Sequence, residues 1–294
     1  MVTSCNLLMG SFPDIRWEFI GEYVEKFIKW LDTTFEGFFD FIHLISSQTI
    51  NGISGFLNFI PWWLFLIIIF LLGWRFKSVL SGVLYAFFIF LIGTFGLWDV
   101  LMITIAIVLT SVLISLIIGI PIGVWMAFSK GFSIFMRPVL DAMQTMPSFV
   151  YLIPAIFFFS LGNVSAVFAT LIYALPPVIR LTELAIRNVD EDIIESAQSF
   201  GSSRWQMLTK VQLPQALPTI MAGVNQTTMM ALAMVVIASM VGAKGLGEQV
   251  LIAINRIDMA LGFEAGISIV FLAIIIDRVT SGVANSFQKH KGAK

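Results

Sequence analysis

Charged residues are scarce in this 294-residue chain, in which Asp, Glu, Lys and Arg together make up 12% of the sequence. Soluble domains typically carry about 25% charged residues. Hydrophobic residues make up 58% of the chain, and the mean hydropathy is +0.94. Because so little charge cannot keep so apolar a chain in solution, the composition excludes an ordinary soluble enzyme and indicates a membrane protein.

Metal-binding and nucleophilic side chains are also few. The chain has one cysteine, Cys5, and two histidines, His43 and His290, which excludes an internal disulfide and disfavours a Cys/His metal site. The formal net charge of −1 excludes a nucleic-acid binder that relies on electrostatic attraction. The apolar stretches contain no H-E-x-x-H motif and no nucleophile–base pair, which disfavours a membrane-embedded enzyme. We therefore expect no catalytic residue, metal or cofactor in this chain.

Long stretches without charge are present instead, and they predict the membrane spans. A spanning helix needs about 20 mostly apolar residues. Charge, Gly, Pro and Asn divide the stretches into seven candidates: 58–74, 78–97, 100–128, 147–161, 164–181, 218–242 and 264–284. The fourth candidate is short and ends at Leu161-Gly162-Asn163, so it is either a span of its own or one broken span with the fifth. The fold class predicted from this pattern is an all-α polytopic membrane protein.

The distribution of Lys and Arg predicts the orientation. When the Arg75–Lys77 turn is placed in the cytoplasm, the alternating loops put twelve basic residues inside and five outside. Short cytoplasmic loops carry the excess of positive charge in membrane proteins. We therefore expect the N-terminus outside and the C-terminus in the cytoplasm, which requires an odd number of spans.

The N-terminal segment has a different pattern. Apolar residues recur with helical spacing through residues 14–45, with acidic residues between them, and Asp32-Thr33-Thr34 offers a cap for a second helix. This predicts an external or interfacial amphipathic segment over 1–57, a membrane domain over 58–284 and a cytoplasmic tail over 285–294. The amphipathic segment is either a scaffold at the membrane surface or a docking surface for an external partner.

The loop between the fifth and sixth spans is polar and carries helix caps. Asp190 is placed to cap a helix that stops at Gly201, and Ser203 with Gln206 forms a capping-box pattern for a second helix. Pro214 and Pro218 are expected to end that second helix before the next span. The pattern predicts two short helices, bent at Gly201 and held outside the bilayer.

Two capped helices in a loop indicate a surface that binds something. The chain has no G-x-x-x-x-G-K-[ST] phosphate-binding loop, so it does not hydrolyse nucleotide through that motif. One hypothesis is that the loop docks a separate ATPase. The alternative is a folded connector between two spans.

At this loop the chain resembles the inner-membrane permeases of ABC importers. Their signature is E-A-A, three residues, Gly, nine residues, and then I-x-L-P. Every spacing is kept here, with Ser196 in place of Ala and Val211 in place of Ile. The matching segment comprises Glu195, Ser196, Ala197, Gly201, Val211, Leu213 and Pro214.

Further segments resemble the glycine betaine/proline betaine and choline branch of these permeases. They are QTMPSFVYLIPAIFFF (144–159), VQLPQALPTIMAGVNQTTMMALAMVVIASMVGAKGLG (211–247) and AIIIDRVT (273–280). The resemblance covers roughly residues 60–284. It implies the type I importer permease fold, similar to that of methionine importers, in a multi-pass protein of the bacterial plasma membrane.

The resemblance also implies an assembly. Two copies of this chain would pair with two ATPase subunits, which bind the ATP and Mg²⁺, and with an extracellular substrate-binding protein. The coupling loop, 182–217, would seat its first short helix in a groove of the ATPase and pass the movement of that subunit into the spans. Glu195 would be either a charge near the helix cap, a partner for a basic residue of the ATPase, or a member of an intrachain ion pair.

Several other residues carry open interpretations. Gly119 and Gly123 favour close helix packing within one chain over a dimer seam, and Asp277-Arg278 favours a local pair over a substrate site. A tight turn or re-entrant loop near the outer gate is expected at Gly242, Gly245 and Gly247. Candidates for the translocation path are Gln144, Met146, Asn225 and Thr228, with helix–helix packing as the alternative role.

A stand-alone secondary transporter or channel for small osmolytes is the alternative function. Such a protein would need ionisable residues within the membrane and, commonly, inverted repeats. The sequence shows neither clearly, and this alternative leaves the capped loop without a role.

Overall fold

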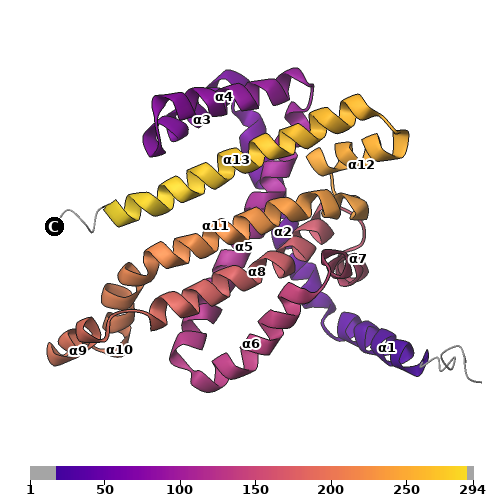
Figure 1. Cartoon of the computed structure of the whole chain (residues 1–294). Helices are drawn as coiled ribbons and strands as arrows, with labels where there is room; N and C mark the ends of the chain where they lie inside the picture. The colour runs from indigo at the N-terminus through magenta and orange to yellow at the C-terminus, as the bar shows by residue number, and fades with distance from the viewer. Residues whose placement is uncertain (1–17, 290–294) are drawn as a thin grey trace, which may run out of the picture. The chain divides into compact units, whose positions relative to one another are not determined.

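The structure is a computed structural model that describes residues 18–289 (Figure 1). Residues 14–17 of the predicted amphipathic helix and 290–294 of the predicted tail lie outside the described residues. All regular structure in the described part is helical, as the sequence predicted. The α-helices are α1 (Glu18–Thr34), α2 (Glu36–Phe59), α3 (Trp62–Phe76), α4 (Val79–Thr94), α5 (Trp98–Phe128), α6 (Lys130–Thr145), α7 (Leu152–Phe159), α8 (Asn163–Arg187), α9 (Glu191–Ser199), α10 (Arg204–Gln206), α11 (Leu213–Ala238), α12 (Leu246–Arg256) and α13 (Met259–Lys289).

The chain divides into two compact units, one ending at Ile42 and one beginning at His43. In the first unit, α1 has exposed aromatic side chains among its charges, including Tyr23, Phe27 and Trp30. Lys29 Nζ lies 2.5 Å from Glu25 Oε1 one helical turn away, and this bond lowers the pKa of the Glu25 carboxyl below its usual value. The helix is amphipathic, as predicted, and it breaks at Phe35 before α2 begins.

Helices long and apolar enough to cross a bilayer lie in the second unit. Within the described residues four qualify singly: Trp98–Phe128, Asn163–Arg187, Arg204–Val241 and Met259–Ala284. The number rises to six if two bent pairs each form one span, namely α2 with α3, bent by 100°, and α6 with the segment Ser148–Phe159, bent by 108°. The helix α4, with 16 residues, is shorter. The predicted count of seven and the predicted orientation stay predictions.

The region of the fourth predicted span shows a feature that the sequence analysis missed. The amphipathic helix α6 occupies residues between the third and fourth predicted spans, for which no helix was predicted, and it turns sharply at Met146-Pro147 into the 3₁₀ turn Ser148–Tyr151 and α7. The Tyr151 hydroxyl donates to the Met143 carbonyl across this elbow. The next break follows at Ser160 and Gly162, both with positive φ, so α7 and α8 are separate helices.

The helix α8 is packed between α5 and α11, and glycines make the close approach possible (Figure 1). A Cβ atom at Gly119 would lie 2.5 Å from Val178 Cγ1, and one at Gly123 would lie 2.6 Å from Thr182 Cβ. On the other side, a Cβ at Gly223 of α11 would lie 3.1 Å from Leu181 Cβ. The interpretation of the Gly119/Gly123 spacing as packing within one chain is therefore confirmed.

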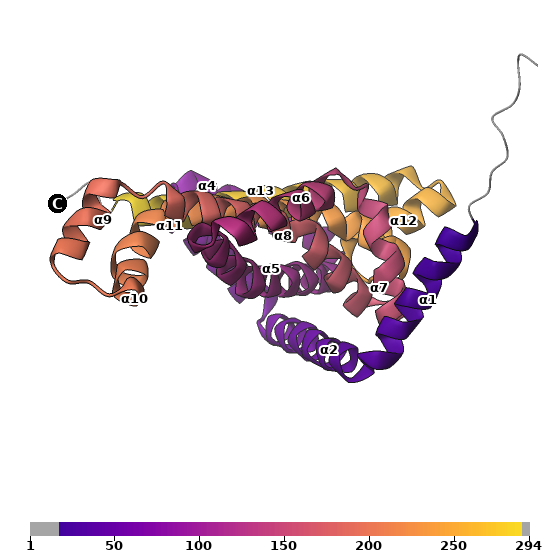
Figure 2. The same ribbon diagram turned by 90° about the horizontal axis from the view of Figure 1, so that it is seen from below.

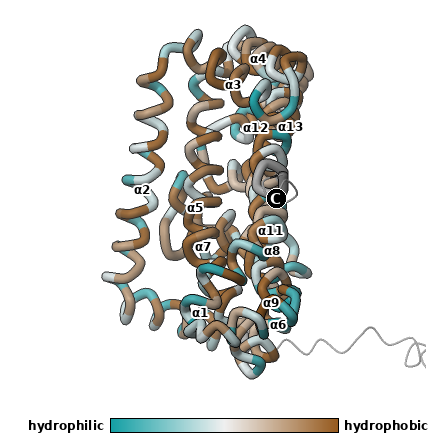
Figure 3. The backbone as a smooth tube through the Cα atoms, turned by 90° about the vertical axis from the view of Figure 1, so that its left-hand side faces the viewer, coloured by the Kyte–Doolittle hydropathy of each residue, from teal (hydrophilic) through white to brown (hydrophobic). Residues whose placement is uncertain are grey.

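A second layer of packing joins α3, α4 and α13. The rings of Phe88 on α4 and Phe271 on α13 stack with their centroids 4.2 Å apart. Apolar residues predominate along α3, whereas hydrophilic residues lie at α9, among other places (Figure 3). Figure 2 shows α9 and α10 together at one end of this unit, next to the start of α11.

The glycine contact between α5 and α8 leads to a matched test. We expect Gly123→Ala to lower the stability of the detergent-solubilised protein by about 1–3 kcal/mol, because the backbone must move to admit the methyl group. Gly266→Ala is the control, since a Cβ there meets no atom within 4 Å. Thermal unfolding measures both, and equal midpoints for the two variants would contradict the close-packing role.

Candidate functional site

The helix α9 begins as the sequence predicted. Asp190 is its N-cap, and the Asp190 carboxylate accepts a hydrogen bond of 3.0 Å from the backbone N–H of Asp192. Glu191 and Asp192 occupy the first turn, where the positive end of the helix dipole favours acidic side chains. The start of α9 is therefore determined by local hydrogen bonds and charge.

The hydrogen bonds at the end of α9 explain why Gly201 follows Ala197 by four residues in the motif. The Gly201 N–H donates to the Gln198 carbonyl at 2.8 Å, and the Ser202 N–H donates to the Ala197 carbonyl at 3.2 Å. This pair of bonds is the Schellman motif, which requires a left-handed residue directly after the helix. Gly201 has φ +75°, and a Cβ there would meet no atom within 4 Å. The glycine is needed for its backbone angle, not for space.

The second short helix, α10, begins with the predicted capping box. The Gln206 N–H donates to Ser203 Oγ at 3.3 Å, and the Ser203 N–H donates to Gln206 Oε1 at 2.9 Å. Two backbone donors at the helix start are satisfied in this way. The segment 190–206 is thus a pair of capped helices joined by one glycine turn.

The expectation that Pro214 and Pro218 end this second helix is wrong. The chain runs from α10 through a π-helical segment, Met207–Gln212, directly into α11. The Leu213 N–H donates to the Leu208 carbonyl five residues back, which widens the helix just before Pro214. Pro214 then lies at the first positions of α11, where its missing N–H costs little, and Pro218 is accommodated inside that helix.

The two halves of the motif have different environments. No residue of α9 is buried, and Glu195 and Ser196 are exposed while Ala197 is half-buried. Among residues 18–289 the Glu195 carboxylate makes no ion pair. In the second half, Leu213 packs against an apolar cluster with Ile186 of α8. The first half is therefore a free surface, and the second half anchors it to the helix bundle.

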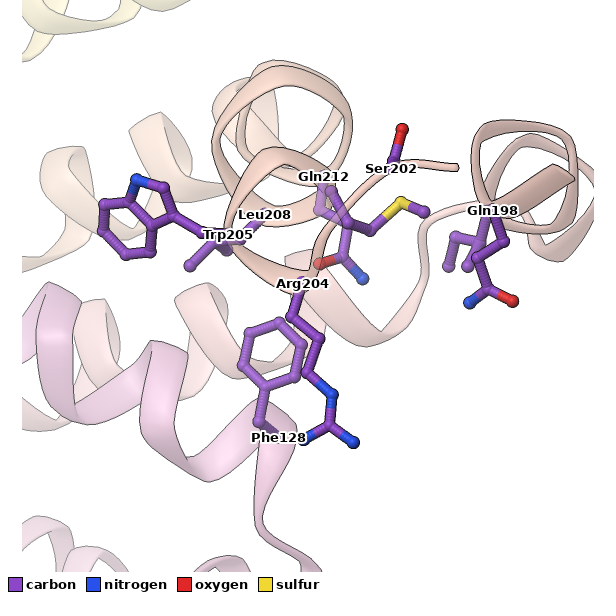
Figure 4. A pocket seen from close by; sticks show the side chains of 9 residues that line it. Phe128, Gln198, Ser202, Arg204, Trp205, Leu208 and Gln212 are labelled. Carbon is purple, nitrogen blue, oxygen red and sulfur yellow. The ribbon is translucent and has the colours of Figure 1, made fainter. Parts of the chain in front are cut away.

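Two large aromatic side chains extend this surface, and the sequence analysis did not single them out. Phe200 is 92% exposed and Trp205 is 72% exposed, on either side of Gly201. Trp205 also lines a pocket of about 890 Å³, which is formed by α9, α10, the π segment and the end of α5 (Figure 4). Its lining includes Phe128, Gln198, Arg204, Leu208 and Gln212. The sequence did contain a signal for this surface, because two aromatic residues lie close to the motif glycine in a loop that is rich in polar residues.

The four path candidates do not come together. Gln144 and Met146 are exposed near the elbow after α6, whereas Thr228 is buried on α11, where its hydroxyl donates to the Val224 carbonyl. The Asn225 amide donates to Asp277 Oδ1 at 3.0 Å and accepts from the Thr280 hydroxyl, so both its ends contact α13. Their role in a path stays a prediction.

The remaining glycine and charge interpretations can be placed as well. Arg278 Nε lies 3.7 Å from Asp277 Oδ2, which is the local pair that was expected. Gly242, with φ +77°, and Gly245, with φ +130°, form a tight turn, which is one of the two expected forms, whereas Gly247 lies in the first turn of α12. The turn is held by Thr104 Oγ1, which accepts from the Leu246 N–H, and by Asn163 Oδ1, which accepts from the Lys244 N–H, both at 2.8 Å.

Comparison with known proteins identifies the family. Residues 119–290, which include the capped pair and α11, match the family described as "Binding-protein-dependent transport system inner membrane component". The chain belongs to this family. It is therefore a multi-pass permease component of a bacterial inner membrane, and the capped pair lies within the region that matches the family.

Curated relatives support the same assignment. The glycine betaine/proline betaine transport system permease protein ProW of Escherichia coli is 47% identical over 90% of this chain and 75% of its own length. The glycine betaine transport system permease protein OpuAB of Bacillus subtilis is 46% identical over 90% of this chain and 94% of its own. The glycine betaine/carnitine transport permease protein GbuB of Listeria monocytogenes is 46% identical over 92% and 96%.

A solved structure confirms the fold. A chain of the MetNI methionine ABC transporter, in an inward-facing conformation, aligns with a TM-score of 0.59 at 21% identity. The alignment covers 63% of this permease and 92% of that chain. The expected type I importer permease fold, similar to that of methionine importers, is therefore present.

The backbone angle of Gly201 can be tested on the permease alone. We expect Gly201→Val to open the turn, because a β-branched residue at this φ is strained, whereas Gly201→Asn should keep it, since Asn tolerates the left-handed region. Limited trypsin digestion measures the change as faster cleavage after Arg204 in the Val variant alone. Equal cleavage in all three proteins, with cleavage after Lys29 as the internal reference, would contradict the prediction.

Proposed function

We propose that this permease forms the translocation path of an ATP-driven importer for glycine betaine or a related quaternary ammonium osmolyte. The support for the substrate class is the similarity to three permeases whose names specify glycine betaine, at 46–47% identity over nine-tenths of this chain. The observation that carries the mechanism is the exposed, doubly capped α9 within the family region.

The assembly in the proposal contains two copies of this permease, two ABC ATPase subunits and an extracellular substrate-binding protein. The ATPase subunits bind ATP and Mg²⁺ and perform the hydrolysis, and this chain supplies no catalytic group and no cofactor. The coupling motif on this chain is Glu195, Ser196, Ala197, Gly201, Val211, Leu213 and Pro214. Phe200 and Trp205 add an apolar contact area to it.

The structure of the loop allows α9 to move as a rigid unit and to displace the helices connected to it. Both its ends are capped, α8 leads into it, and the capped α10 continues through the π segment into α11. A displacement of α9 by the ATPase therefore moves the ends of α8 and α11 together. Because glycines hold α8 tightly between α5 and α11, the movement reaches the centre of the bundle. Closing of the ATPase dimer would open the path outward, and hydrolysis would reset it.

The path itself is proposed to bind the substrate weakly, because the external binding protein supplies affinity. Quaternary ammonium groups are attracted to aromatic faces, and polar side chains near the central helices would contact the carboxylate of a betaine. Gln144, Met146, Asn225 and Thr228 remain the candidates for this lining.

Uptake by the reconstituted complex tests the function. We expect labelled glycine betaine to enter proteoliposomes only when the permease, the ATPase and the binding protein are all present with ATP. Competition with proline betaine, choline and carnitine would then define the substrate. Uptake by the permease alone along an ion gradient would refute the proposal and support a secondary transporter.

The docking surface has its own test. We expect Trp205→Ala to weaken association with the ATPase by about thirtyfold, since loss of an aromatic anchor at an interface costs about 2 kcal/mol. Tyr23→Ala is the control, because Tyr23 is similarly exposed, at 70%, but lies on α1. Co-purification and titration of the ATPase measure the difference, and unchanged affinity in the Trp205 variant would exclude this surface.

A further inference from the structure

A buried carboxylate lies in the second unit, away from the motif, and neither the sequence analysis nor the family assignment gives it a role. Glu183 is on α8, and its side chain is 6% exposed. One of its oxygens, Oε1, accepts from the Ser133 hydroxyl at 2.6 Å and from Arg137 Nη2 at 3.1 Å, both on α6. It also lies 3.0 Å from Arg187 Nε, one turn along α8. Three donors therefore converge on one oxygen.

The same cluster reaches α5. Arg187, besides its contact with Glu183, donates from Nη2 to the Met126 carbonyl at 2.8 Å, in the last turn of α5. A second ion pair, Arg180 with Asp141, joins α8 to α6 further along. Glu183 is the only one of these charged side chains that is almost fully buried. It is therefore the centre of a junction among α5, α6 and α8.

The junction lies at the start of the predicted coupling loop, 182–217, directly before the capped pair of helices over residues 190–206. Arg187 is the last residue of α8, and Asp190, the N-cap of α9, follows three residues later. Thr182, the residue before Glu183 on α8, makes the close contact with Gly123 of α5. A force applied to α9 must pass through this end of α8 before it reaches the rest of the bundle. The bonds from Glu183 and Arg187 join this end of α8 to α6 and α5. They therefore determine how far α6 and α5 move when α8 moves.

We propose that Glu183 is a positioning residue that transmits the displacement of α9 to α6 and α5. This inference rests on the proposed function and adds the residue through which the coupling loop acts. The negative charge is essential to it, because Oε1 faces two guanidinium groups in a partly desolvated site, where charge-assisted bonds are strong. Without the charge, the bonds from both arginines to this oxygen become weaker neutral bonds, and α8 moves with α9 while α6 does not follow.

This role differs from that of a residue that merely stabilises the fold. A purely structural loss lowers the amount of assembled complex, so uptake and ATP hydrolysis fall together. A loss of transmission leaves the ATPase docked and active but separates hydrolysis from transport. The amount of substrate imported per ATP hydrolysed is therefore the decisive quantity.

The experiment uses the full complex in proteoliposomes, with labelled glycine betaine uptake and phosphate release measured on the same sample. We expect Glu183→Gln, which keeps the shape and removes the charge, to lower uptake per ATP by about tenfold, within the usual range of coupling between sites. Hydrolysis should remain near the wild-type rate. Ser133→Ala removes only one of the three donors and should lower the ratio less.

The matched control is Glu25→Gln, which removes the carboxylate of an exposed ion pair on α1 and should leave the ratio unchanged. An unchanged ratio in Glu183→Gln, or a parallel fall of uptake and hydrolysis in a normally assembled complex, would overturn the inference. If Glu183→Gln does not assemble, an unchanged ratio in Ser133→Ala would overturn it. Absence of ATP-dependent uptake by the wild-type complex would instead refute the proposed function.

Discussion

The close packing of α8 between α5 and α11 is the constraint on which the rest of this permease depends. A side chain with a Cβ atom at Gly119 or Gly123 would push α5 away from α8. In a lipid environment helices associate through such close contacts, because burial of apolar surface from lipid gives little driving force. The contact makes three helices from distant parts of the chain behave as one body. It also places the end of α8, where the coupling segment begins, at the edge of that body.

The coupling segment is built by a different principle. Its shape comes from short-range hydrogen bonds at Asp190, Gly201 and Ser203, each between residues at most five positions apart. The spacing between Ala197 and Gly201 follows from the Schellman motif, which needs a left-handed residue directly after the last helical turn. A segment held by its own caps keeps its shape while it is exposed, as a docking element must. Its exposed aromatics then supply the contact area.

Charge is concentrated where these two parts meet. The described membrane helices carry few charges, yet the middle of α6 and the end of α8 bring Glu183, Arg137 and Arg187 together. Breaking a buried pair of this kind is costly because it leaves a charge without a partner. Such a cluster therefore resists separation of the helices that carry it. The cluster is therefore suited to transmit a displacement of α8 to α6, because the two helices stay joined when α8 moves.

The sequence by itself determined the helical class, the caps of α9 and α10, the turn at Gly201 and the approximate positions of most apolar helices. These depend on composition and on contacts within a few residues, which a linear pattern records. It did not reveal α6, whose residues lie between two predicted spans, and it wrongly ended the second short helix at Pro214 and Pro218, because the π segment leads directly into α11, which accommodates both prolines. Only the tertiary structure joined Glu183 to Ser133, 50 positions away, and Asn225 to Asp277, 52 positions away. Partners at such separations are chosen by which helix faces meet, and that choice depends on the packing of the whole bundle.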